Sequence, residues 1–401
     1  MWPRSVHAGA AGPPVSAERF FPGWLIGCWG LAVAVAAAGA LSQYALAATV
    51  AVEGAHVPLF SSFNAAHFQL DYLAQGFIKR GLAGTLLAAF DGAERRTLAI
   101  AIAVAALLAL CAVLAIVLWA CRRRLARADF RLLAALWLAL PTGVINLGYD
   151  IGRLDHLNLL LLVAALAAQR RGQGLWVCMT SVLALLIHEA YLFYGLPLLM
   201  ADALSRPRPS GPTRARCEPG VWIHGLVVVA TLAVLWGWGR FEPGRAALIQ
   251  SLDGRVPAAH NVLNVWLRSL AENLGYVGER WAQGLFAPSE LLLFGVLIGT
   301  ALGLAWSVAR LNRQSLDMRW FASLAVLPLF ALGVDYARWV ALFWTVSLAA
   351  ITLGVLDGRF TRLYPPRLAG IVTTAAIASL ALGPVGSVHA FPVISALWQA
   401  L

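Results

Sequence analysis

The sequence contains few charged residues. Asp, Glu, Lys and Arg together make up 12% of its 401 residues, and Lys79 is the only lysine. Soluble domains carry about 25% charged residues, so the composition excludes an ordinary soluble protein. Cysteine is also scarce, and the five cysteines form no CxxC pair and no Cys/His cluster at metal-ligand spacing. The sequence therefore indicates neither a zinc site nor a disulfide framework.

Hydrophobic residues dominate instead, at 60% of the chain. The apolar runs are long enough to cross a bilayer, and they predict an all-α, polytopic integral membrane protein with about eleven transmembrane helices. The first run, from Trp24, is too long for the core of a cleaved signal peptide. We divide the chain into an N-terminal segment, 1–23, and a single transmembrane domain, 24–401. The predicted spans are 24–49, 97–120, 132–147, 156–169, 175–187, 191–203, 221–238, 290–309, 320–334, 339–356 and 368–386.

The distribution of arginine predicts the orientation of these spans. Cytoplasmic loops of membrane proteins are enriched in Lys and Arg. Placing the N-terminus in the cytoplasm puts most arginines inside and most acidic residues outside, so the net charge of +11 reflects orientation rather than nucleic-acid binding. The runs 175–187 and 191–203 can also form one kinked helix, which would invert everything after residue 203.

Two of the predicted outside segments are long, 50–96 and 239–289. In the first, a helical reading predicts two juxtamembrane helices joined by a basic bend at Lys79–Arg80, and it puts four polar residues on one face: Asn64, His67, Asp71 and Gln75. The second segment contains an apolar stripe at helical spacing, formed by Leu263, Leu267, Leu270, Leu274, Val277 and Trp281. A helix with this stripe would lie in the membrane interface, roof a cavity or pack on its own protein.

Acidic residues that interrupt the apolar sequence collect on the predicted outer side. They are Asp71, Asp150, Asp155, Glu189 and Asp335. Ionisable groups at membrane depth are costly and usually face a cavity or a partner. Acids carried to one side by four separate segments therefore suggest a shared site, although acids in solvated loops would need no such explanation.

Two turns resemble each other, Gly148-Tyr149-Asp150-Ile151-Gly152-Arg153 and Gly333-Val334-Asp335-Tyr336-Ala337-Arg338. Each Asp–Arg pair is either an ion pair at a helix end or an arginine that binds phosphate and is oriented by its aspartate. His188–Glu189 lies beside three aromatic residues, as a carbohydrate or isoprenoid site would require. Leu192 stands where the zinc-protease motif HExxH needs histidine, so that class is excluded.

The order of these parts resembles the GT-C superfamily of membrane glycosyltransferases. One span is followed by an outside loop with two juxtamembrane helices and an aspartate, and then by a short outside turn with further acids between spans three and four. The resemblance covers roughly residues 20–240. The first loop has no DxD motif, only Asp71 in Leu70-Asp71-Tyr72, which leaves metal dependence open. Several segments also look like those of bacterial polysaccharide-biosynthesis membrane proteins.

The resemblance implies a polyprenyl-phosphate sugar as donor and a glycan or lipid-linked acceptor, used at the periplasmic face of the bacterial inner membrane. Asp71 would be the general base of an inverting transfer. Arg80, Arg153 and Arg338, with Lys79 behind them, would bind the departing phosphate, and His188, Glu189 and Asp335 would contact substrate. Asp150, Asp155 and His156 would hold Mg²⁺ or Mn²⁺, or position the acceptor.

Three other functions remain open at this point. A polymerase or ligase of lipid-linked glycans would use similar outside arginines and acids. A transporter or flippase would bind its substrate through intramembrane charges, but an inverted repeat would put the two Asp–Arg turns on opposite faces rather than on one. A purely structural membrane subunit would leave the outward acids unexplained.

Overall fold

The computed structural model describes residues 62–140, 142, 146, 151–206, 219–258, 260–284, 288–314 and 318–363. Its regular elements are helices, in agreement with the predicted all-α class. The N-terminal segment 1–23 and the predicted spans 24–49 and 368–386 lie outside the described residues. The helices are α2 (Ser62–His67), α3 (Tyr72–Gln75), α4 (Leu82–Thr85), α5 (Gly92–Arg122), α6 (Arg127–Ala139), α8 (Leu154–Arg170), α9 (Gly174–Ile187), α10 (Tyr191–Ser205), α11 (Pro219–Trp238), α12 (Gly244–Leu252), η3 (Asn261–Leu263), α13 (Asn264–Leu267), α14 (Leu270–Ala282), α15 (Pro288–Leu311), α16 (Met318–Ala322), η4 (Ser323–Val326), α17 (Leu329–Leu332) and α18 (Tyr336–Leu356).

Three of the described helices are long and apolar enough to cross a bilayer: Gly92–Arg122, Glu290–Leu311 and Tyr336–Leu356. Shorter apolar helices accompany them, at Gly174–Ile187, Tyr191–Ser205, His224–Trp238 and Met318–Leu332. These helices fall on predicted spans, and together they indicate a helical membrane protein. The predicted number of eleven spans is not confirmed, because most of the helices are shorter than a bilayer is thick.

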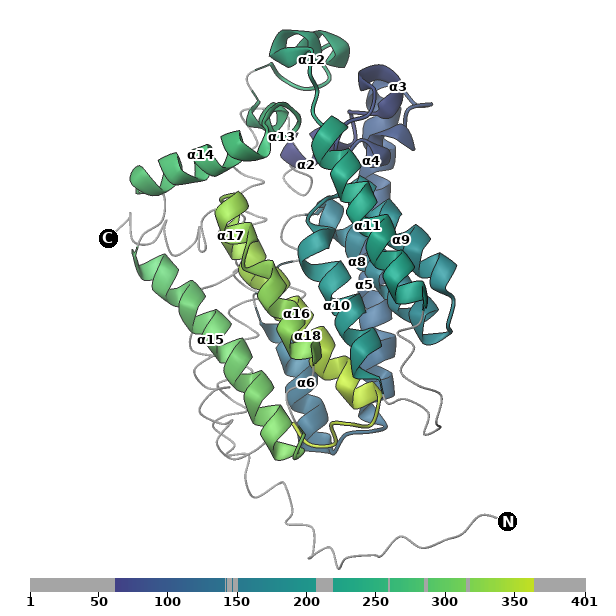
Figure 1. Ribbon diagram of the computed structural model, residues 1–401, viewed down its shortest axis with the longest axis vertical. Helices are drawn as coiled ribbons and strands as arrows, with labels where there is room; N and C mark the ends of the chain where they lie inside the picture. Colours follow the sequence, from purple (N-terminus) through teal and green to yellow (C-terminus); the bar gives the residue numbers. More distant parts are fainter. Residues whose placement is uncertain are drawn as a thin grey trace, which may run out of the picture.

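α18 lies in the middle of the bundle, and α5 runs behind α8 and α10 in the view of Figure 1. Within its most apolar stretch α18 is 89% buried, whereas the corresponding stretch of α5 is 17% buried. A helix that is apolar on all sides is stable where other helices surround it or where lipid does. The burial therefore assigns α18 to the protein core and leaves the outer face of α5, with exposed Leu108, Ile116 and Trp119, for the lipid chains.

α9 and α10 are two separate helices that run in opposite directions. α9 ends at Ile187, and α10 begins at Tyr191 after a short turn. Asp202, near the end of α10, contacts Arg170 at the end of α8, whereas His188 in the turn lies beside Arg338 at the start of α18. The alternative prediction that 175–187 and 191–203 form one kinked helix is therefore wrong.

The bundle has two chemically different ends. We call the end that carries Arg80, Asp155, His188 and Arg338 the loop end, and the end formed by the last residues of α5, α8, α10, α15 and α18 the basic end. At the basic end a network of ion pairs joins two aspartates to three arginines. Asp202 binds Arg170 at 3.2 Å, Arg206 at 2.5 Å and Arg319 at 3.1 Å, and Asp357 binds Arg170 at 2.9 Å and Arg319 at 2.5 Å.

The two long segments predicted to lie outside pack on each other at the loop end. A small apolar core around the buried Trp266 joins α2, α3, α12, η3 and α13. Lys79 connects the two segments: its backbone N–H donates to Gly239 at 2.8 Å, its carbonyl accepts from the Trp266 indole at 2.9 Å, and its ammonium donates to the Arg268 carbonyl at 3.2 Å. We call these two packed segments the cap. Lys79 therefore holds the cap together.

The helical reading of the first loop is wrong in detail. The chain breaks after α2 and begins again at α3, because Asp71 adopts an extended conformation and caps α3, accepting hydrogen bonds from the N–H groups of Leu73 and Ala74. Side-chain capping of this kind satisfies N–H groups that a helix start leaves free. The polar face predicted across residues 64–75 is thus divided between two short helices and the turn between them.

The apolar stripe of the second loop is also interrupted. Ser269 and Glu272 form a capping box that starts α14 as a new helix, so Leu263 and Leu267 lie in η3 and α13. Of the stripe residues in α14, Val277 is buried while Leu270, Leu274 and Trp281 are about half exposed. α14 therefore packs on the protein with only part of its apolar face.

Candidate functional site

Asp71 and Arg95 form a buried ion pair at the start of α5. Both terminal nitrogens of Arg95 donate to Asp71 Oδ2 at 3.0 Å, and the guanidinium also donates to the carbonyls of Phe68 and Gly84. The other carboxylate oxygen of Asp71 accepts the two cap hydrogen bonds of α3. Both oxygens of Asp71 are therefore engaged in holding the first loop on α5.

Gly84 allows this arrangement because the chain passes very close to it. A Cβ at this position would lie 1.8 Å from the carbonyl oxygen of Leu70 and 3.0 Å from Arg95 Nη2. Residue 84 must therefore be glycine for the two turns of the loop to meet around the guanidinium. The loop is a closely packed unit rather than a pair of independent interfacial helices.

Arg80 reaches from the first loop into the turn between α9 and α10. Its backbone has a positive φ of 61°, a conformation that costs a non-glycine residue about 1 kcal/mol or more. The side chain forms a two-pronged ion pair with Glu189, with Nε lying 3.0 and 2.9 Å from the two oxygens. Its Nη1 lies 3.2 Å from Nε2 of His67, whose Nδ1 donates to the Phe63 carbonyl. The ion pair compensates for the backbone strain.

Arg338 contacts the same turn from the first turn of α18. Its Nε donates to Asp155 Oδ2 at 2.6 Å, its Nη1 to Asp335 Oδ2 at 3.2 Å, and its Nη2 lies 2.9 Å from Nε2 of His188. The predicted Asp335–Arg338 pair is therefore present at a helix start. The same guanidinium also joins α8 and the α9–α10 turn, which the spacing of the sequence did not reveal.

The His188–Glu189 turn brings the two arginines into one site. His188 ends α9, with its backbone carbonyl accepting from Asn158 at 2.9 Å and its Nδ1 accepting from the Ala190 N–H at 3.0 Å. These bonds fix the turn, so that His188 faces Arg338 while Glu189 faces Arg80. Segments from the first loop, α8, the α9–α10 turn and α18 thus meet at the loop end.

Burial and the neighbouring arginines keep the two histidines of the site, His67 and His188, neutral. Burial, with Arg80 nearby, lowers the pKa of His188 to about 3, and burial with Arg80 also lowers the pKa of His67 well below its usual value. Burial alone would raise the pKa of Glu189, but Arg80 brings that pKa well below its usual value. At neutral pH the site therefore holds charged arginines and carboxylates beside neutral imidazoles.

Two acids of the site retain some access to solvent. The side chains of Glu189 and Asp335 are 26% and 30% exposed, whereas that of Asp155 is 3% exposed. Asp335 contacts Arg338 through Oδ2, and Oδ1 has no hydrogen-bond partner among the described residues. The side chains of Arg80 and Arg338 are themselves 14% and 13% exposed. The site is therefore partly open to solvent.

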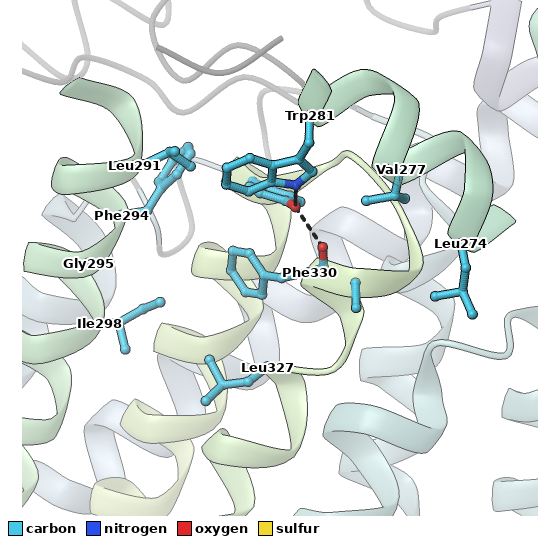
Figure 2. Close-up of a pocket in the computed structure, with 12 residues that line it drawn as sticks. Leu274, Val277, Trp281, Leu291, Phe294, Gly295, Ile298, Leu327 and Phe330 are labelled. Carbon is cyan, nitrogen blue, oxygen red and sulfur yellow. Dashed lines mark hydrogen bonds between the residues drawn. The ribbon is translucent and has the colours of Figure 1, made fainter. Parts of the chain in front are cut away.

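An apolar groove opens beside the charged residues, with a volume of about 670 Å³. α14 forms its roof, and α15, α17 and the start of α18 form its walls (Figure 2). Trp281 of α14 donates to the Tyr336 hydroxyl at 2.5 Å, which donates in turn to the Phe330 carbonyl at 2.7 Å. Tyr336 follows Asp335 in the chain, so the groove and the ion pairs share the first turn of α18.

Of the three predicted metal ligands, the structure describes Asp155 and His156. Asp150 lies outside the described residues. Asp155 is paired with the Arg338 guanidinium and accepts from the Tyr194 hydroxyl at 3.5 Å, and His156 is almost fully buried. The described part of the chain contains no group of three His, Cys, Asp or Glu residues placed to hold a metal.

The structure unites some of the predicted residues and separates others. Arg80, His188, Glu189, Asp155, Asp335 and Arg338 come together. Arg153 is buried with its Nη1 3.3 Å from Asn146 Oδ1, and Lys79 lies in the cap. His67 also belongs to the site, although the sequence predicted only that it lies on the polar face of a helix. Arg95 was missed, because beside Arg96 it looks like the ordinary basic flank of a span.

No known protein family, curated protein or solved structure matches this chain. Its function must therefore be argued from the geometry of the site.

We predict that Asp71→Asn and Arg95→Gln each destabilise the protein by about 3 kcal/mol, because each leaves a buried partner without its counter-charge. The double variant should lose little more than either single one, since the two changes remove the same interaction. The free energy of unfolding of the parent, the two single variants and the double variant, measured on purified protein in detergent, completes this double-mutant cycle. Exposed Glu94, one residue from Arg95, provides the control Glu94→Gln, which should stay within about 0.5 kcal/mol of the parent. If the stability losses of the two single variants add up in the double variant, the Asp71–Arg95 ion pair is not the interaction that was removed.

The His188 pKa predicts a dependence of stability on pH. Between pH 6.5 and about 3 the unfolded chain binds a proton at this position and the folded chain does not, so stability falls as the pH falls. From pH 7 to pH 5 this group should cost about 2 kcal/mol. Unfolding measured at both pH values should show a smaller loss for His188→Gln than for the parent protein. Equal losses would show that His188 is protonated or accessible in the folded state.

Proposed function

We propose that the protein is a membrane glycosyltransferase that transfers a sugar from a polyprenyl-phosphate donor to an acceptor hydroxyl at its loop end. One observation carries the proposal: two partly exposed arginines and a solvent-accessible carboxylate converge beside an apolar groove. Such a site suits a substrate with an anionic head and a long apolar tail. The opposite end carries the arginines that cytoplasmic loops favour, so the proposed site faces away from the cytosol.

Arg80 and Arg338 are the groups we propose for the donor phosphate. A guanidinium binds phosphate oxygens in pairs and keeps its charge at every accessible pH. In the structure carboxylates occupy both guanidiniums, and the longest of these contacts is the 3.2 Å bond from Arg338 Nη1 to Asp335. A phosphate oxygen that takes this position would release Asp335. Donor binding would then create the base that the reaction needs.

The groove is the place we propose for the first isoprene units of the donor. Its lining is formed mainly by aliphatic and aromatic side chains of α14, α15 and α17, including Leu274, Phe294 and Phe330. A polyprenyl tail in the bilayer is already out of water, so the groove would bind it through close packing rather than through a further hydrophobic gain. Since Tyr336 of the groove and Asp335 of the site are consecutive, a tail in the groove would place its phosphate near Arg338.

The proposed reaction displaces the phosphate at the anomeric carbon. The acceptor oxygen forms a bond to that carbon, the bond between the carbon and the phosphate oxygen breaks, and polyprenyl phosphate leaves with the electron pair. The acceptor proton passes to a carboxylate. Arginines that stabilise the charge growing on the leaving phosphate lower the barrier, and attack opposite the leaving group inverts the anomeric configuration.

Asp335 is the carboxylate that the geometry favours as base. A base must reach the acceptor proton within hydrogen-bond distance, and Asp335 combines 30% exposure with an oxygen that accepts no bond in the described residues. Asp71, which the family resemblance suggests, has both oxygens engaged by Arg95 and the α3 cap. We therefore propose that Asp71 is a positioning residue that fixes the loop carrying Arg80.

We predict that Asp335→Asn lowers the transfer rate a hundredfold or more, about the contribution of a general base, without weakening donor binding. Purified protein in nanodiscs would be incubated with a panel of synthetic polyprenyl-phosphate sugars and a panel of glycan and lipid-linked acceptors, and mass spectrometry would follow the glycosylated acceptor and the released polyprenyl phosphate. A nanodisc encloses no second compartment, so a transporter or flippase would give no product.

The matched control is Glu242→Gln, an exposed acid of the same cap, which should keep the parent rate. An unchanged rate in Asp335→Asn would remove Asp335 as the base. If Asp71→Asn instead lost transfer at unchanged stability, Asp71 would be the base. No release from any donor would overturn the proposed activity.

We predict that Gly295→Leu weakens the use of long-chain donors about tenfold. Gly295 lines the groove, and a Cβ there meets open space, so the new side chain would fill volume that two methylene groups of the donor need. A short donor, a sugar methyl phosphate with no isoprene unit to enter the groove, should be used as before. Gly299→Leu, one turn along α15 and outside the groove lining, is the control. Equal losses for short and long donors would place the tail elsewhere.

A further inference from the structure

The described part of the basic end carries many exposed arginines. Those exposed there are Arg122, Arg123, Arg124, Arg127, Arg131, Arg171, Arg310, Arg313 and Arg362. None of them forms an ion pair with an acid among the described residues. Most of them lie at the ends of α5 and α15, just after α18 and at the start of α6, which are at the bottom of the bundle in Figure 1.

The acids of the basic end are already engaged inside the protein. Asp202 and Asp357 bind three other arginines in the network described above. Asp129 accepts a hydrogen bond from the Leu363 N–H at 2.5 Å. The described part of this end therefore offers its exposed arginines no carboxylate, and their guanidiniums are open to a counter-charge from outside the protein.

The chain that carries the last of these arginines is firmly held. Asn312 at the end of α15 donates to the Arg362 carbonyl at 2.6 Å and accepts from the Thr361 N–H at 2.9 Å. Arg359 donates to the Ser205 carbonyl at 3.0 Å. The backbone of 357–363 is thus fixed to α6, α10 and α15, so its arginines project from a rigid backbone and a ligand has only their side chains to order.

Two tryptophans mark the level of the bilayer surface at this end. The Arg123 guanidinium lies 3.8 Å from the Trp119 ring centre, and the Arg310 guanidinium lies 5.0 Å from that of Trp306. Both tryptophans are about half exposed, on two of the long apolar helices. Tryptophan favours the membrane interface, and a neighbouring arginine reaches the headgroups from there. The exposed arginines are therefore at the height of the lipid phosphates.

We infer that this surface binds the headgroups of anionic phospholipids in the leaflet that faces the basic end. The phosphodiester of a lipid such as phosphatidylglycerol supplies the missing counter-charge, and the guanidiniums bind its oxygens in pairs. The inference is independent of the proposed transferase activity, because it uses neither the loop-end site nor the groove. The densest part of the surface is the α5–α6 turn, with Arg123, Arg124 and Arg127.

The test is native mass spectrometry of the full chain, purified in detergent and given equal amounts of phosphatidylglycerol and phosphatidylcholine. The parent protein should retain phosphatidylglycerol severalfold more than phosphatidylcholine, and the preference should decline as salt is added. The triple variant Arg123→Gln, Arg124→Gln, Arg127→Gln should lose most of the preference. These side chains are exposed, so the variant should keep the parent unfolding temperature.

A second triple variant removes the same charge from the loop end: Arg96→Gln, Arg240→Gln, Arg280→Gln. It should keep the lipid preference. Equal retention of both lipids by the parent, or equal losses in the two triple variants, would overturn the inference, since binding would then depend on net charge alone. It would also be overturned if the first triple variant kept its lipid preference but lost binding to an RNA oligonucleotide, which would assign the surface to a soluble polyanion.

Discussion

The contact of Arg338 with Asp155, Asp335 and His188 is the interaction on which the loop end depends. A charged group in an apolar bundle is costly unless partners surround it. Arg338 meets this condition by using its guanidinium nitrogens on three different segments. The start of α18, the start of α8 and the α9–α10 turn are thereby fixed relative to one another, and Arg80 joins the first loop to the same turn through Glu189. Burial and charge pairing thus determine the site together.

Two kinds of chemistry are separated along the bundle. At the loop end the acids and arginines leave part of their polar surface accessible, and a groove lies beside them. At the basic end Asp202 and Asp357 form ion pairs with three arginines, and most of the other arginines of the described part of this end are exposed. The separation follows from the alternating direction of the helices. Successive turns lie at opposite ends of the bundle, and those at one end carry acids while those at the other carry arginines. A site for a lipid-linked substrate at one end and a surface for lipid headgroups at the other are both consistent with this division.

The sequence predicts the helical class, the position of most apolar helices and the gathering of several acids at one end. These features depend on composition and on the length of apolar runs, which are local properties. The role of Asp71 could not be predicted, because its partner Arg95 looks like a span flank and because the break in the helix depends on the cap that Asp71 itself forms. Lys79 looked like a phosphate ligand, yet its contacts come from Gly239, Trp266 and Arg268, which only tertiary packing brings near. Long-range pairs of this kind leave no periodic signal.

The position of α18 has a mechanical consequence. Its first turn is tied to α8 and the α9–α10 turn through Arg338, and Asp357, directly after its last turn, is tied to Arg170 and Arg319. Sliding this helix along its axis by one turn, about 5.4 Å, would rupture anchors at both extremities at once. A piston movement through the middle of the bundle is therefore opposed by charge as well as by packing. Any opening that admits a bulky amphiphile has to come from the periphery, where α14 and α15 border the groove, while the central rod stays still.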